Sequence, residues 1–154
     1  MHLTVRAASI LVVVCVVTAG SGFHARAQSV PNPCSLLTKA EMQKLTGNAN
    51  AMSFPNRPDK SGAYSICIID GGGTKELGFE FRLTTRTVRT PLKGGEPLSG
   101  IGDSATYDHT PGNARVSVAK GPYFLSVGAQ STDTPQALKD VTIAVARGAA
   151  AKLP

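Results

Sequence analysis

The sequence predicts an α+β domain: an antiparallel sheet of about five or six strands, with a short N-terminal helix and a C-terminal helix packed on one face, and one disulfide. Three observations lead to this prediction. Strand-like alternation of apolar and polar residues recurs between residues 63 and 128, a well-marked short helix precedes it, and an amphipathic helix follows it.

The first 27 residues have the three-part plan of a secretory signal peptide. Met1–Arg6 is short and basic, Ala7–Ala19 is continuously apolar, and the next segment ends in the small residues of an Ala-x-Ala site, which predicts cleavage after Ala27. The apolar run is shorter than the roughly 20 residues of a membrane span. We therefore expect a periplasmic or secreted protein with no stable membrane span after cleavage, in which residues 28–154 form a single domain of 127 residues, 154 minus 27.

Cleavage also changes the charge and the cysteine count. Arg6 and Arg26 leave with the leader, so the net charge falls from +6 to +4. A mild positive excess suits an anionic envelope surface, but ordinary solubility is the simpler reading. Because Cys15 also leaves, Cys34 and Cys67 remain as one pair in an oxidising compartment, and we expect them to be bonded.

The helix is predicted from start and stop signals around residues 38–47. Thr38 and Glu41 have the spacing of a capping box, and Leu37 and Met42 that of a hydrophobic staple. Gly47 is the left-handed residue that commonly ends a helix. A bond from Cys34 would tie the start of this helical segment to a strand around Cys67.

The strands are expected in two groups. Residues 48–54 form a short first strand, residues 55–62 a loop, and residues 63–69 a central strand buried on both sides, because Ile66 and Ile68 alternate with Cys67 and Ile69. Residues 75–85 alternate most clearly and should form a hairpin with that strand.

The second group is a meander. Residues 86–102 show no periodicity and are expected to be a long surface loop. Three strands follow at residues 105–108, 115–119 and 123–128, with turns at residues 109–113 and 120–122. Thr134 and Pro135 then begin the last helix, whose apolar residues recur every three to four positions.

Several short motifs occur in a recurring order: Pro-Cys-x-Leu-Leu-Thr at Pro33–Thr38, a second cysteine about thirty residues later, Gly-Ile-Gly-Asp-Ser-Ala at Gly100–Ala105, and a closing Ala-rich helix. Together they resemble a family of bacterial cell-envelope proteins and lipoproteins of unknown function, mycobacterial in type, whose mature part opens Asp-Pro-Cys-x-Leu-Leu-Thr. The resemblance implies that Cys34 and Cys67 form a disulfide. This chain has Asn32 where the family often has Asp, and it lacks the family's lipid-anchor cysteine.

The sequence offers no catalytic set, and we expect no cofactor, no metal site and no enzyme. His109 is the only histidine after cleavage, and beside Asp108 in a predicted turn it is read as a solvated loop residue. Ser104 lacks the context of a nucleophile elbow. The glycines that precede Thr74 and Lys75 lack phosphate-loop spacing and predict a hairpin turn.

One charge grouping is retained as a candidate site for an anionic partner. It comprises four cations, Arg82, Arg86, Arg89 and Lys93. Protection of an edge strand by charge explains the same residues and is the favoured reading. Nucleic acid is not expected, because recognition motifs and clustered aromatic residues are missing.

The leading functional hypothesis is a non-catalytic binding module of the cell envelope, with an unknown envelope protein or an anionic surface as its partner. Its contact surface is expected on the exposed sheet face or in the loop at residues 86–102. A small lipid or hydrophobic-ligand carrier is the alternative, with its cavity between the sheet and the C-terminal helix. An unrecognised hydrolase comes third and requires His109 beside a serine and a carboxylate in a cleft.

Overall fold

In the computed structural model the described residues are 30–47, 52–53, 57–58, 64–70, 77–86 and 94–154. The predicted signal peptide, Arg89, Lys93 and the Gly71–Lys75 turn lie outside them. Two helices and a 3-10 turn accompany one sheet; the helical segments are η1 (Pro33–Ser35), α1 (Lys39–Thr46) and α2 (Pro135–Ala151). The strands are β1 (Met52–Ser53), β2 (Arg57–Pro58), β3 (Tyr64–Asp70), β4 (Gly78–Thr85), β5 (Glu96–Leu98), β6 (Ser104–Thr110), β7 (Asn113–Lys120) and β8 (Tyr123–Gln130).

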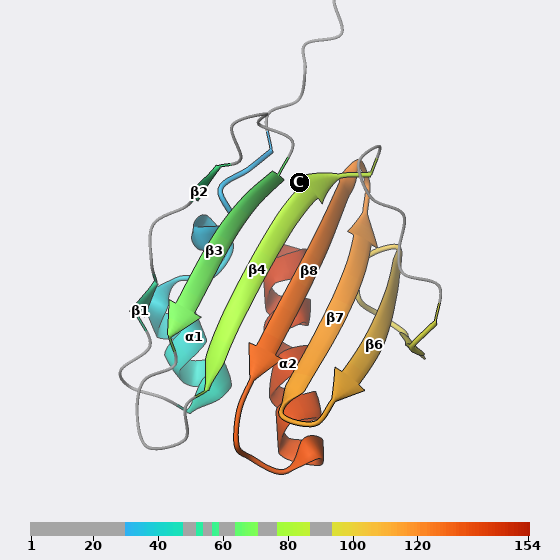
Figure 1. Ribbon diagram of the computed structural model, residues 1–154. Coiled ribbons are helices and arrows are strands. Elements are labelled where there is room, and N and C mark those ends of the chain that lie inside the picture. The colour runs from blue at the N-terminus through green and yellow to red at the C-terminus, as the bar shows by residue number, and fades with distance from the viewer. Residues whose placement is uncertain (1–29, 48–51, 54–56, 59–63, 71–76, 87–93) are drawn as a thin grey trace, which may run out of the picture.

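All the strand pairs of this sheet are antiparallel, in the order β1-β3-β4-β8-β7-β6-β5, with β2 also pairing with β3. Five strands are long and three are short, and both helices lie behind the sheet in Figure 1. The predicted fold class is therefore confirmed. The pairing of β4 with β8 joins the β3–β4 hairpin to the β6–β7–β8 meander.

The core lies between the sheet and the helices. Phe81 and Leu83 of β4 stand opposite Val127 and Leu125 of β8, and all four side chains are fully buried. From the other side, α2 contributes buried residues at helical spacing: Leu138, Thr142, Val145, Ala146, Ala149 and Ala150. This is the apolar stripe of the predicted C-terminal helix, and Thr134 caps it as expected by accepting from the Ala137 amide at 3.3 Å.

Small residues of α2 allow α1 to pack closely against it. A side chain added at Gly148 would meet Leu37 at 3.3 Å and Leu45 at 3.4 Å, so α1 and the turn before it lie directly on this glycine. Near the same end of α2, the Lys120 ammonium donates to the carbonyls of Ala150 at 3.0 Å and Leu153 at 2.7 Å. A cation on the last carbonyls of a helix satisfies acceptors that the helix itself leaves unpaired.

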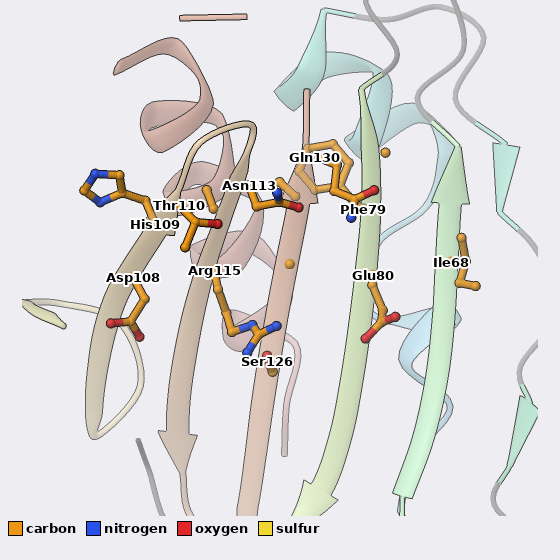
Figure 2. A pocket seen from close by; sticks show the side chains of 14 residues that line it. Ile68, Phe79, Glu80, Asp108, His109, Thr110, Asn113, Arg115, Ser126 and Gln130 are labelled. Carbon is orange, nitrogen blue, oxygen red and sulfur yellow. The ribbon is translucent and has the colours of Figure 1, made fainter. Parts of the chain in front are cut away.

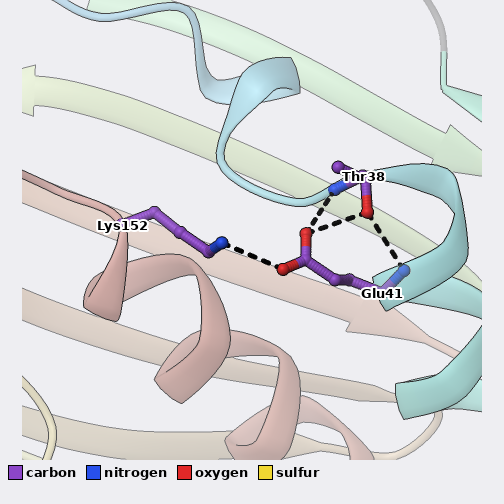
Figure 3. A network of polar contacts seen from close by, with 3 residues as sticks. All are labelled: Thr38, Glu41 and Lys152. Carbon is purple, nitrogen blue, oxygen red and sulfur yellow. Dashed lines mark hydrogen bonds and ion pairs between the residues drawn. The ribbon is translucent and has the colours of Figure 1, made fainter.

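The capping box of α1 is present and extends to α2 (Figure 3). The Glu41 carboxylate accepts from the Thr38 amide at 2.8 Å and from the Thr38 hydroxyl at 2.9 Å, and Lys152 lies 3.0 Å from its other oxygen. The Thr38 amide, followed by Lys152, lowers the pKa of the Glu41 carboxyl from its ordinary value of 4.5 to about 2. Gly47 ends the helix in the left-handed conformation, at φ +69°, as predicted.

Four expectations about the strands were wrong. Residues 57–58 and 96–98 were expected in loops but form the short strands β2 and β5, each containing a proline, which is tolerated at a sheet edge. His109 was expected in a turn but belongs to β6, because the hairpin turn is confined to Pro111 and Gly112. β3 is not buried on both sides: Ile68 is 49% exposed, on the face of the sheet opposite the two described helices.

The Cys34–Cys67 disulfide is present and ties η1 to β3. Cys67 is fully buried and points to the helix side of the sheet. The bond closes a loop of 34 residues, 67 minus 34 plus one.

We predict that the double substitution Cys34→Ala/Cys67→Ala lowers the free energy of unfolding by about 3.8 kcal/mol, since the cross-link restricts the unfolded chain.

Urea unfolding of the oxidised protein measures this loss, and the wild-type protein reduced with dithiothreitol is the matched control, which should lose about as much. Equal stability of the double variant and the oxidised protein would contradict the structural role of the bond.

We also predict an acid-dependent loss of stability from Glu41. Because its pKa is lower in the folded state, at about 2 against 4.5, its contribution is fully present above pH 4.5 and disappears as the pH falls toward 2. Glu41→Gln should therefore show a smaller drop in urea midpoint between pH 6 and pH 2.5 than the wild type. Lys152→Gln should keep most of the drop, because the Thr38 amide is the larger cause. Identical pH profiles of wild type and Glu41→Gln would refute this role.

Candidate functional site: the open face of the sheet

The face of the sheet opposite the helices, here called the open face, carries side chains that alternate with the core residues along each strand. Its middle is formed by two rows of register partners running from β3 to β6. One row is Ile68, Glu80, Gly128, Arg115 and Asp108, and the next is Ile66, Arg82, Ser126, Ser117 and Thr106.

A hollow of about 600 Å³ lies on this face over β4, β8, β7 and β6 (Figure 2). Gly78 and Gly128 have no side chain to fill it, and Ile68 borders it on β3. Its charged and amide-bearing walls come from four strands, with Glu80 on β4, Gln130 on β8, Arg115 on β7 and Asp108 on β6. Figure 2 shows Arg115 extending toward Ser126, with Glu80 across from it on β4.

The charges around the hollow are only partly paired. Arg82 lies 3.2 Å from the Glu80 carboxylate, and its guanidinium carbon is 5.8 Å from the centre of the Tyr64 ring. By contrast, Arg115 is exposed and makes no ion pair with any described residue. Arg115 is therefore a cation of this surface without an ion-pair partner in the described part of the chain.

Several buried polar atoms on the open face have no hydrogen-bond partner among the described residues. They are Arg82 Nε, Thr84 Oγ1, Thr106 Oγ1, Asp108 Oδ2 and Ser117 Oγ, and the register places every one of these side chains on the open face. Buried polar groups are ordinarily satisfied, because leaving one unpaired costs roughly 1–3 kcal/mol. Their concentration on one face indicates a surface suited to hydrogen bonding rather than a second apolar core.

The two described members of the predicted cationic grouping have different partners and lie at different places in the fold. Arg82 is half-buried on the open face beside Glu80, whereas Arg86 follows β4 and lies 3.9 Å from Asp103. Arg86 also donates to the Gly121 carbonyl at 3.4 Å, and the Gly121 amide donates to the Asp103 carboxylate at 2.8 Å. Arg82 and Arg86 are thus each engaged with a carboxylate. Arg89 and Lys93 lie outside the described residues, and the four-residue patch stays a prediction.

His109 does not meet the geometric condition set for hydrolysis. His109 is among the residues that line the hollow, but its ring stacks on Tyr107, with centroids 5.8 Å apart, and Figure 2 shows the ring directed away from Arg115 and Glu80. No hydrogen bond joins it to a serine or a carboxylate within the described residues.

Tyr107 is buried beneath Lys139, whose ammonium lies 5.1 Å from the ring and 2.6 Å from Glu96, so this cluster attaches β5 to α2. Burial raises the pKa of Tyr107.

Arg115 and Gly128 are the residues of this site that sequence reasoning missed. The signal was present in both cases. Arg115 and Ser117 alternate with Val116 and Val118, which predicts an outward side chain, and a glycine inside a strand often marks a close approach to the backbone.

Within the described ranges, no group of three or more His, Cys, Asp or Glu side chains is placed to hold a metal ion. Among the same residues, no helix combines the length and the hydropathy needed to cross a membrane. In comparisons with protein families, with curated proteins and with solved structures, nothing matches this chain.

Proposed function

We propose that this chain is an exported, non-catalytic interaction module of the cell envelope and that the open face is its contact surface. One observation carries the proposal: both helices pack on the same side of the sheet, while the other side holds a hollow lined by charged and hydrogen-bonding groups. Binding sites are typically concave surfaces with a few convergent polar groups.

The composition of the open face supports binding rather than simple solvation. An exposed apolar residue, Ile68, borders the hollow, and Arg115 lines it as well, without an ion-pair partner among the described residues. Arginine is enriched at protein interfaces because its planar head group makes several hydrogen bonds at once. An envelope partner with a carboxylate group would meet this cation.

A hydrophobic-ligand carrier has less support. It requires a cavity between the sheet and α2, where Phe81, Leu125 and Val145 are fully buried in the core. The hollow described above lies on the opposite face. The disulfide suits an oxidising compartment and thereby supports export.

We predict that reversing a charge on the open face, or introducing one at its exposed apolar residue, abolishes partner capture. Oxidised protein comprising residues 28–154 is cross-linked in envelope extract, and Arg115→Glu and Ile68→Arg are compared with wild type. Both side chains are solvent-exposed, so these substitutions should leave the fold intact, which circular dichroism checks. Arg147→Glu, on the exposed side of α2, is the matched control and should retain capture.

The same partner recovered equally with wild type, both open-face variants and Arg147→Glu would exclude this face. Co-sedimentation with vesicles of phosphatidylglycerol and phosphatidylcholine forms a second arm. Arg115-dependent binding there, with no captured protein, identifies an anionic surface as the partner.

A further inference from the structure

Three register partners in the middle of the open face have a specific arrangement of charge. Gly128 on β8 stands directly between Glu80 on β4 and Arg115 on β7. Glu80 and Arg115 are thus two strand spacings apart, about 10 Å between their backbones. The gap between them, here called the strip, has no side chain because its residue is Gly128. Their side chains rise on the same face and border the same hollow (Figure 2).

From this arrangement we propose that the hollow binds a small zwitterion, an amino acid or a dipeptide, with its carboxylate on Arg115 and its ammonium group on Glu80. The ligand backbone would lie over Gly128, and the Ser126 hydroxyl borders the same strip. The inference rests on the proposed function and specifies the chemistry that the open face recognises.

The charge balance of the hollow favours a zwitterion over a simple anion. Arg115 is flanked along its row by two carboxylates, because Asp108 is its register partner on β6 and Glu80 lies beyond Gly128. A phosphate or sulfate bound to Arg115 would be repelled by Asp108 and, less strongly, by Glu80, whose charge is offset by its ion pair with Arg82. An ammonium group on the ligand offsets this repulsion, and charge-assisted hydrogen bonds at both ends fix its orientation.

The size of the hollow also favours a small ligand. Its volume of about 600 Å³ lies within the range of small-molecule sites, and its floor is recessed where Gly78 and Gly128 interrupt the side chains of the neighbouring strands. The pairing of Arg82 with Glu80 at 3.2 Å holds the acid in place before binding, which reduces the ordering cost.

Isothermal titration calorimetry of residues 28–154 with L-alanyl-L-alanine tests the proposal. The N-acetyl dipeptide lacks the ammonium charge and the dipeptide amide lacks the carboxylate, and each should bind at least about tenfold more weakly, since a charged hydrogen bond is lost. L-Alanine, with the same two charges closer together, establishes the spacing that the site accepts.

Two variants locate the site. Arg115→Gln should weaken the zwitterion by about tenfold and leave the amide, which has no carboxylate, unaffected. Gly128→Val fills the strip and should abolish binding while the protein stays folded, because a Cβ there meets only the Glu80 carbonyl, at 3.9 Å. Arg147→Gln is the control for loss of a charge elsewhere and should bind as wild type does.

The outcomes separate this inference from the proposed function. No binding of either L-alanine or the dipeptide, with Arg115-dependent capture of an envelope partner, overturns the zwitterion and leaves the open face as a contact surface. If the protein neither binds a zwitterion nor captures an envelope partner through Arg115, both the inference and the proposed function are overturned. Sedimentation showing a wild-type dimer that Gly128→Val disrupts would overturn the inference in favour of a second copy on this face. Equal binding of all three dipeptide forms would also refute it.

Discussion

The pairing of β4 with β8 is the constraint on which the rest of the structure depends. Each half of the sheet is a local unit, a hairpin on one side and a meander on the other, and this one ladder joins them. Its register brings Phe81 against Val127 and Leu83 against Leu125, all on one face. α2 covers that face together with the two helical segments before β1, so every described helix lies on one side of the sheet.

The connections that hold the helices also stiffen the floor of the hollow. The disulfide fixes η1 on β3, Lys120 binds the final carbonyls of α2, and the Glu41–Lys152 contact joins the two helices. β3 and β7 are therefore tied to the helical segments on the side opposite the hollow. A sheet restrained in this way presents Glu80 and Arg115 at a fixed separation, and such pre-organisation lowers the cost of binding.

Local signals predicted much of the fold, because they act within a few residues of the chain. The capping box of Thr38 and Glu41, the Pro135 helix start and the alternation from Leu77 to Leu83 are of this kind. The β4–β8 pairing joins segments far apart in sequence, and no local pattern specifies it.

The errors and omissions have physical reasons as well. The three residues of β5, with Pro97 at their centre, are too short for a period. Ile66 and Ile68 suggested burial because hydropathy does not reveal how many faces of a sheet the helices cover. The site itself depends on lateral register between β4, β8 and β7, which alternation within one strand does not contain.

The most direct test of the open face as a contact surface is chemical-shift mapping of isotope-labelled residues 28–154 titrated with the captured envelope fraction. Our account predicts shifts concentrated on the amides of β4, β7 and β8 around Gly128, and shifts confined to α2 or to the β5 edge would contradict it.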